Sequence, residues 1–194
     1  ISTMLVLFDD CWVDSSSLGK QPDPKLGMHN SGWLRCPGKE FYKDSINLLP
    51  VLEQYTKGII RSFANDNRVT VWDLYNEPGN SGRLTKTLPL LKNIFKWTRE
   101  MNPLQPITAG IWNTIPQYKQ LVQLQMANSD IITFHHYGNM ERLLDFLPQF
   151  QEKDRPLVCT EYMARTKESL FKTHLTYFKK RNIGAYNWGF VRGK

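Results

Sequence analysis

Six short runs of apolar residues recur along the chain, and within each run the apolar positions are nearly continuous. Their approximate bounds are residues 3–9, 69–75, 106–111, 130–136, 156–160 and 184–188. A strand with one solvated face alternates apolar and polar positions, whereas a strand buried on both faces of a parallel sheet does not. The six runs therefore predict six parallel strands.

Longer stretches with a helical spacing of apolar residues separate these strands. In residues 41–65, apolar side chains recur every three or four positions at Leu48, Leu52, Tyr55 and Ile59, which is the period of an amphipathic helix. Four further helices are expected at residues 84–101, 115–126, 141–151 and 167–180. Strands and helices that alternate in this way predict an α/β fold with a parallel sheet.

The composition is that of one globular domain over residues 1–194. Hydrophobic residues make up 41% of the chain and aromatic residues 12%, which is enough for a sizeable core. No apolar run approaches the ~18 residues of a membrane span, and the first residues read as a strand rather than a signal peptide. The net charge is +7, but basic residues cluster only at 179–181, at a helix end, so we expect neither nucleic acid nor membrane as a partner.

The three cysteines are odd in number and lack C-x-x-C spacing. This argues against a disulfide framework and against a zinc site. Cys159 lies in an apolar run and reads as a small core residue. The adjacent His135 and His136 have no third ligand at a recognisable spacing, so no metal site is expected.

Two glutamates stand where apolar runs end. V-T-V-W-D-L-Y-N-E-P, residues 69–78, places Glu77 behind a strand, and P-L-V-C-T, residues 156–160, leads directly into Glu161. Two carboxylic acids at the carboxyl ends of parallel strands suit a general acid/base and a nucleophile. A strand-end glutamate can instead cap the next helix. Asn-Glu-Pro behind an apolar strand is rarer than that, and the pair favours catalysis.

The motif W-D-L-Y-N-E-P, followed by T-E-Y at residues 160–162 and Y-N-W-G-F at 186–190, resembles the retaining glycoside hydrolases of clan A, which include cellulase-like enzymes. The resemblance covers nearly the whole chain. It implies a partial (β/α)8 barrel in which the glutamate strands are the fourth and seventh, so that the first two strand–helix units and the last helix are missing. It also implies a carbohydrate substrate, no cofactor, and a secreted or periplasmic location.

The resemblance assigns roles to individual residues. Glu77 would be the acid/base and Glu161 the nucleophile, with their carboxyl groups about 5 Å apart, as retention requires. Asn76 would hydrogen-bond the 2-hydroxyl of the sugar. On the sixth strand of the family pattern, Tyr137 could hydrogen-bond Glu161 and keep it ionised, while one histidine could tune the acid. The resemblance thus makes His135, His136 and Tyr137 candidates for binding the sugar, although strand alternation places His135 and Tyr137 on one face and His136 on the other.

Several further residues could bind sugar. Trp188 matches the aromatic floor under the sugar ring in the family pattern, although a strand tryptophan can equally be core. The long Pro- and Gly-rich connection over residues 10–40 follows a strand, so Trp12 and Trp33 could shape the rim, or the segment could be a simple insertion. Asp9 and its neighbour Asp10 could bind hydroxyl groups or merely cap the loop.

The chain also departs from the family pattern. An arginine that the clan commonly carries on an early strand has no counterpart, which would deprive Glu161 of a cation that lowers its pKa. Six strands leave two sheet edges open, at residues 3–8 and 184–188, and such edges favour self-association. We expect a retaining β-glycoside hydrolase acting on plant-type β-linked polysaccharide or oligosaccharide. The alternative is a non-catalytic or weakly active carbohydrate-binding fragment of a barrel that needs a partner chain to complete its site.

Overall fold

The computed structural model describes residues 2–14, 19–20, 23–28, 30–151 and 154–188. Each predicted strand is present within one residue of its apolar run, although most strands are shorter than the run. The bounds are β1 Thr3–Val6, β2 Val69–Asp73, β3 Ile107–Thr108, β4 Ile132–His135, β5 Leu157–Glu161 and β6 Gly184–Ala185. The pattern of continuous apolar runs thus located all six strands of the described residues.

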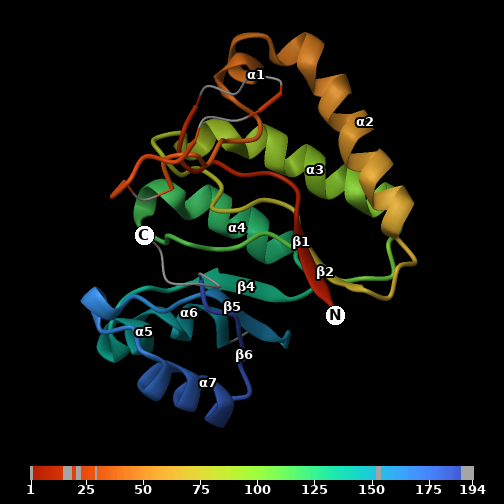
Figure 1. The fold of residues 1–194 in the computed structure, drawn as a ribbon. Helices are drawn as coiled ribbons and strands as arrows, with labels where there is room; N and C mark the ends of the chain where they lie inside the picture. The colour runs from red at the N-terminus through yellow and green to blue at the C-terminus, as the bar shows by residue number, and fades with distance from the viewer. Residues whose placement is uncertain (1, 15–18, 21–22, 29, 152–153, 189–194) are drawn as a thin grey trace.

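Helices occupy the connections between strands, as the periodicity predicted, but some of the predicted helical stretches are divided into two helices (Figure 1). The α-helices are α1 Lys39–Lys43, α2 Ser45–Phe63, α3 Leu88–Met101, α4 Lys119–Asn128, α5 Met140–Phe146, α6 Pro148–Gln151 and α7 Thr176–Lys180. Asp44 interrupts the first predicted helix with a non-helical backbone, at φ −138° and ψ 56°. Asn102 ends α3 in the left-handed conformation, at φ 47°, before Pro103 prevents its continuation. The expectation of five undivided helices was therefore wrong.

The strands form two parallel three-stranded sheets in the orders β1-β2-β3 and β4-β5-β6. Ile111, just beyond β3, joins them, because its N–H donates to the carbonyl of Thr133 at 2.9 Å and its carbonyl accepts from His135 N–H at 2.9 Å. Strands adjacent in sequence are therefore adjacent in space, as in a β/α barrel. Within the described residues β1 and β6 do not pair with each other, so the barrel is an open arc.

The core has two parts, one for each sheet. Trp72, Ile60 and Leu91 are fully buried between the first sheet and the helices α2 and α3. Phe134, Phe150 and Phe178 are fully buried between the second sheet and α5–α7. A hydrogen bond of 2.8 Å between the hydroxyls of Thr108 and Thr133 joins β3 to β4 between the two parts. Cys159 is buried in the second core, as expected, and all three cysteines are free.

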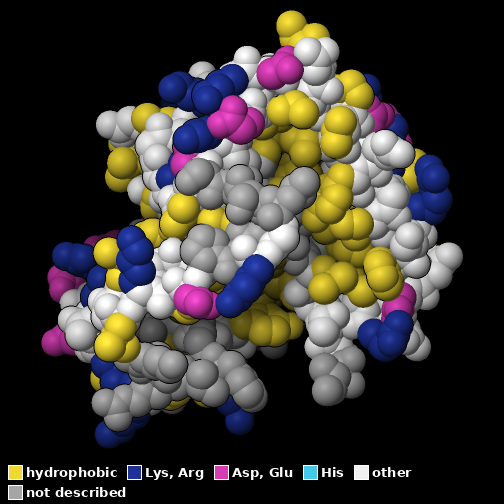
Figure 2. Space-filling model, turned by 45° about the horizontal axis from the view of Figure 1, so that its top comes forward, with side chains coloured by type: hydrophobic (Ala, Val, Ile, Leu, Met, Phe, Trp, Pro, Cys, Tyr) yellow, Lys and Arg dark blue, Asp and Glu magenta, His cyan; other side chains and the backbone are white. Residues whose placement is uncertain are grey.

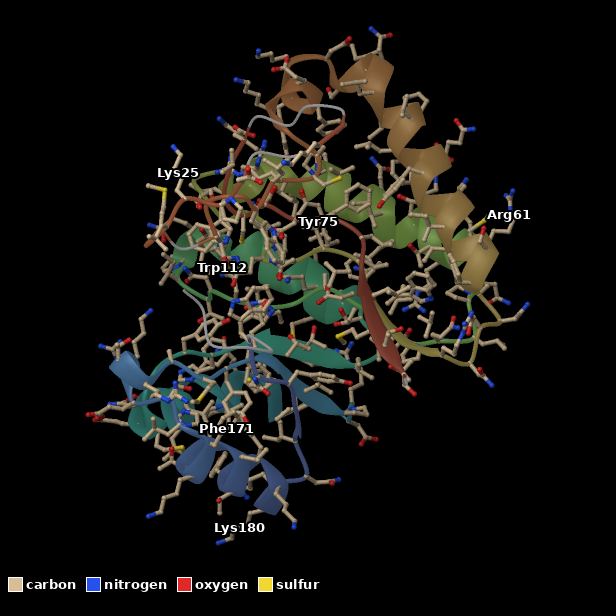
Figure 3. All side chains as sticks on the ribbon, in the orientation of Figure 1. Lys25, Arg61, Tyr75, Trp112, Phe171 and Lys180 are labelled. Atoms are coloured by element: carbon tan, nitrogen blue, oxygen red, sulfur yellow. The ribbon has the colours of Figure 1, made fainter. Side chains whose placement is uncertain are left out.

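Basic side chains point away from the molecule in different directions. Lys25, Arg61 and Lys180 lie on three separate sides in Figure 3, so they form no common patch. No helix in the described segments combines the length and the apolar character that a membrane span requires.

One face of the molecule exposes a broad hydrophobic area (Figure 2). On the outermost strand β1, Val6 is 52% exposed, and on α2 Ile46, Val51, Tyr55 and Phe63 are also exposed. Of these side chains, Val6 lies on the sheet edge that the sequence predicted to be open. The predicted self-association through that edge stays a prediction.

Candidate active site

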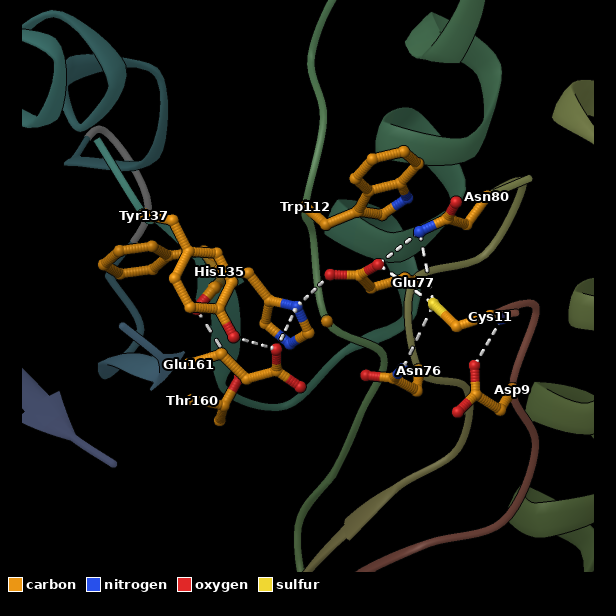
Figure 4. Close-up of polar contacts among 12 residues, drawn as sticks. Asp9, Cys11, Asn76, Glu77, Asn80, Trp112, His135, Tyr137, Thr160 and Glu161 are labelled. Atoms are coloured by element: carbon orange, nitrogen blue, oxygen red, sulfur yellow. Dashed lines mark hydrogen bonds and ion pairs between the residues drawn. The ribbon is translucent and has the colours of Figure 1, made fainter. Parts of the chain in front are cut away.

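Two glutamates and a histidine meet at the carboxyl ends of the strands (Figure 4). Glu77 follows the end of β2 by four residues, His135 ends β4 and Glu161 ends β5. Parallel strands present their carboxyl ends at one edge of a sheet, which is why these side chains converge. One carboxylate oxygen from each glutamate and one ring nitrogen of His135 lie within 4.8 Å of one another.

The group lines a cavity of about 630 Å³ whose walls combine aromatic rings with polar side chains. Its lining comprises the two glutamates with Cys11, Trp12, Asn30, Trp33, Asn76, Asn80, Trp112, Tyr137, Met163, Ala164, Thr166, Lys167 and Trp188. Aromatic rings stack against the apolar C–H faces of sugars, while carboxylates and amides bond their hydroxyls. The cavity therefore suits a carbohydrate better than a uniformly apolar ligand.

A tight turn after β2 aims Glu77 into this cavity. Glu77 has a φ of 46° and Gly79 a φ of 84°, in the left-handed region that is strained for a non-glycine residue. The N–H of Gly79 donates to Asp10 at 2.7 Å, and Asp10 also accepts from the hydroxyl of Tyr75 at 2.9 Å. A Cβ at Gly79 would lie 2.6 Å from Cδ1 of Leu121. Glycine is therefore required there, and the buried Asp10 anchors the turn.

Both oxygens of Glu77 accept hydrogen bonds. Nδ1 of His135 lies 2.8 Å from Oε1, while the thiol of Cys11, at 3.1 Å, and the amide of Asn80 donate to Oε2. Burial by itself raises the pKa of Glu77, but the bonds from His135, Cys11 and Asn80 outweigh burial and bring the pKa below its ordinary value. In the empty site Glu77 is therefore stabilised as a carboxylate.

Glu161 has a different environment. The hydroxyl of Tyr137 donates to its Oε2 at 2.6 Å, and Nδ1 of His135 lies 3.4 Å from the same oxygen. Burial raises the pKa of Glu161, and the attraction of His135 and the bond from Tyr137 only partly offset that rise. The contact between Tyr137 and Glu161 is the one that the family resemblance implied.

His135 stands between the two carboxylates and is itself buried. Burial lowers its pKa, but Glu77, Glu161 and Asp73 act in the opposite direction and leave the pKa raised. Asp73 lies at the end of β2, 2% exposed, and burial raises its pKa to about 7. The only group of three His, Cys, Asp or Glu side chains in the described residues that could hold a metal ion is Glu77, His135 and Glu161.

His136 lies on the opposite side of β4 from this group. Its ring packs against Phe146, with centroids 5.6 Å apart, and against His174, at 6.3 Å. Burial and the neighbouring His174 lower the pKa of His136 to about 4. The assignment of both histidines to sugar binding therefore needs correction for His136, because successive strand residues point to opposite faces.

The tryptophans named from the sequence line the cavity together. The rings of Trp33 and Trp188 meet edge to face, with centroids 5.3 Å apart, and Trp12 lies in the same wall. Nε1 of Trp33 donates to Asp9 Oδ2 at 2.5 Å, and the N–H of Cys11 donates to Asp9 Oδ1 at 2.6 Å. Asp9 thus fixes the loop and orients Trp33, which matches the capping alternative. Asp10 is fully buried and also matches the capping alternative, not the binding of sugar hydroxyl groups.

Some residues that line the cavity were not identified from the sequence. Cys11 follows the two aspartates that end the first apolar run, and Asn80 follows Glu77 by three residues in N-E-P-G-N. The glycine in that motif indicates a turn that returns Asn80 to the glutamate. Trp112 donates through Nε1 to the carbonyl of Pro78 at 3.1 Å, so it supports the same turn. No spacing in the chain pointed to Trp112.

Structural comparison shows a shared fold with larger glycosidases. A Faecalibacterium prausnitzii β-glucuronidase has a TM-score of 0.50 and 17% identity, with 73% of this chain and 29% of that chain covered. An FMN-binding β-glucuronidase from strain L2-6 of the same organism has a TM-score of 0.51 and 18% identity, with 72% and 25% covered. The chain thus spans less than a third of these structures. At such identity the likeness concerns the fold alone.

Sequence comparison is more specific. No curated relative matches the chain. The family model described as cellulase (glycosyl hydrolase family 5) matches residues 26–192, a span that contains both glutamates, His135 and Tyr137. The chain belongs to the cellulase family, glycosyl hydrolase family 5.

Proposed function

We propose that this chain carries the site of a retaining β-glycoside hydrolase, with Glu77 as acid/base and Glu161 as nucleophile. The observation that carries the proposal is the approach of their carboxylate oxygens to within 4.8 Å. Retaining enzymes hold the two carboxyl groups about 5–5.5 Å apart, whereas inverting enzymes hold them about 6.5–9.5 Å apart to admit a water molecule. The separation here leaves no room for that water.

The reaction would proceed in two displacements. Glu161 attacks the anomeric carbon while Glu77 gives its proton to the leaving glycosidic oxygen, so that one C–O bond forms as another breaks. Glu77 then removes a proton from water, and that water releases the sugar from Glu161. Asn76, which lines the cavity beside Glu77, is suited to bonding the 2-hydroxyl as charge develops on the ring.

The pKa values of the two glutamates are shifted in the directions opposite to those that these roles require. The pKa of Glu77 lies below its ordinary value and that of Glu161 above it, whereas an acid must hold a proton and a nucleophile must not. His135 contacts both carboxylates and can pass the proton between them. Positive charge on the sugar ring in the transition state favours ionised Glu161. A cation from a segment that completes the barrel would act in the same direction.

We assign plant-type β-linked polysaccharide or oligosaccharide as the substrate. Three tryptophans, Trp12, Trp33 and Trp188, line the cavity of about 630 Å³. Together they offer stacking surfaces for more than one sugar ring. An alternative is a weakly active carbohydrate-binding chain that needs a partner to complete its site. The observation that favours this alternative is that β1 and β6 are edge strands, each paired on one side only in the described residues.

Hydrolysis of a panel of β-glycosides tests the proposal. Glu161→Ala should abolish activity on every substrate, whereas Glu77→Ala should lose least on nitrophenyl glycosides, because an activated leaving group needs little protonation. Azide should rescue Glu77→Ala with formation of a β-glycosyl azide. Equal losses for both variants on nitrophenyl substrates, or a product of inverted configuration, would refute the assignment. Binding without turnover by the native chain would support the alternative.

A further inference from the structure

Cys11 is in contact with the carboxylate that we assign as acid/base (Figure 4). Its Sγ lies 3.1 Å from Oε2 of Glu77, and the amide nitrogens of Asn80 and Asn76 lie 3.2 and 3.7 Å from the same sulfur. The side chain is 3% exposed. Its backbone is fixed by the bond from Cys11 N–H to Asp9. The thiol is therefore held against Glu77 from a different strand of the sheet.

The surroundings keep this thiol protonated. Burial raises the pKa of Cys11 far above its ordinary value, and the nearby carboxylates of Glu77 and Asp9 raise it further. A thiol has a single proton. The two amides donate to the sulfur, so that proton is free to point at Oε2 of Glu77. Cys11 thus acts as a hydrogen-bond donor and not as a thiolate nucleophile.

We propose that Cys11 is a positioning residue for the acid/base: its S–H fixes Oε2 of Glu77 and stabilises the carboxylate that forms when Glu77 gives up its proton. The inference rests on the proposed function of Glu77. A donor to the charged form makes a carboxylic acid stronger and also favours the carboxylate that acts as base in the second displacement. Asn80 donates to the same oxygen, so the thiol and the amide act as a pair.

Other groups also face Glu77 and must stay constant in any test. The titratable ones are His135 and Tyr137 from β4 and the residues after it, Glu161 from β5, and Tyr118 near the start of α4. Asp9 also faces the sulfur of Cys11, and its carboxylate acts on the thiol together with that of Glu77. A substitution of Cys11 by a residue of similar or smaller size therefore changes the donor to Oε2 and leaves these groups in place.

Three variants separate donation from packing. Cys11→Ala removes the donor, and Cys11→Ser keeps one, an O–H that donates more strongly than S–H although the shorter C–O bond leaves its oxygen farther from Oε2. Cys36→Ala is the matched control, since Cys36 is exposed and is not among the residues that line the cavity. The first measurement is a carbon-13 NMR titration of the Glu77 carboxyl, assigned by its loss in Glu77→Gln. The second is kcat/KM on alkyl and nitrophenyl β-glycosides across pH.

The inference expects Cys11→Ala to move the Glu77 titration and the basic limb of kcat/KM to higher pH. It expects kcat/KM to fall about tenfold on alkyl glycosides, the value of one charge-assisted bond, with little loss on nitrophenyl glycosides. Cys11→Ser should restore both. An unmoved Glu77 titration in folded Cys11→Ala would overturn the inference. If the native chain cleaves no glycoside, the proposed function fails while the titration still decides the role of Cys11.

A measurement on the native thiol covers the case in which Cys11→Ala does not fold. The infrared S–H stretch of Cys11, identified by its loss in Cys11→Ser, should lie at the low frequency of a thiol bonded to a carboxylate. It should shift to higher frequency in Glu77→Gln, because an amide oxygen is a weaker acceptor. An S–H band at the frequency of a free thiol in the native protein would overturn the inference.

Discussion

Replacing the proposed nucleophile by its amide should stabilise the folded protein while abolishing turnover. Carboxylate oxygens of Glu77 and Glu161 no more than 4.8 Å apart repel each other by about 3.5 kcal/mol at an effective dielectric constant of 20. Protonated His135, 3.4 Å from Glu161, returns about 5 kcal/mol by the same calculation. The attraction exceeds the repulsion by about 1.5 kcal/mol, so the raised pKa of Glu161 means that burial outweighs the net attraction. Glu161→Gln removes this burial cost and keeps the acceptor for Tyr137.

The sign of the effect depends on pH. A carboxyl whose pKa is higher in the folded than in the unfolded protein binds its proton more tightly when folded, so it stabilises at low pH and this stability is lost as the pH rises. The advantage of Glu161→Gln should therefore be absent well below pH 4.5, the ordinary value, and grow as the pH rises. It should grow again when His135 loses its proton, because the attraction then disappears while the repulsion stays.

Thermal melts of the native chain, Glu161→Gln and Glu77→Gln over pH 4 to 9 test this reasoning. If the burial cost exceeds the net attraction by about 1 kcal/mol at pH 8, Glu161→Gln gains about 1 kcal/mol, or about 2–4 °C in Tm. Glu77→Gln is the matched control with the opposite sign. The pKa of Glu77 lies below its ordinary value, so its charge stabilises above pH 4.5 and the amide should lower Tm there. The same sign for both variants at pH 8 would refute the reasoning.

Three further expectations concern the turn, the rim and the sheet edge. Gly79→Ala should destabilise by more than about 2 kcal/mol in denaturant unfolding, since its Cβ would lie 2.6 Å from a side-chain carbon of Leu121. Gly58→Ala, in an open position on α2, should instead stabilise by about 1 kcal/mol. Trp33→Phe loses the bond to Asp9 and should raise KM about 3–10-fold with kcat little changed. Val6→Lys, at the exposed edge of β1, should shift light-scattering mass toward 22.7 kDa if the chain self-associates.

The sequence located the two glutamates that we propose as acid/base and nucleophile, because both follow strands that are locally encoded. Continuous apolar runs need no distant partner to be recognised, and Glu77 and Glu161 stand at their ends. Strand alternation likewise placed His135 and Tyr137 together and His136 apart. The resemblance to the glycosidase clan, which the family match confirms, then added roles that spacing alone does not supply.

Residues on loops were predicted less well, because their positions depend on contacts between distant segments. Cys11 touches Glu77 across 66 positions of sequence, and Trp112 touches Pro78 across 34. Asp9 lies at the end of the same apolar run as Asp10, yet one aspartate holds Trp33 and the other is fully buried under the turn at Gly79. Two adjacent carboxylates with such different partners look identical in sequence.

The open arc does not prevent the site from forming, and the reason lies in the strand order. Glu77 follows β2 and Glu161 ends β5, which are the central strands of the two sheets. Each central strand is hydrogen-bonded on both sides, so the carboxylates are fixed by pairing that the chain itself provides. His135 lies where the sheets join, through the bond of its N–H to Ile111, and it contacts both glutamates. The open edges at β1 and β6 therefore affect the rim, where Trp33 and Trp188 meet, more than the spacing of the two carboxyl groups.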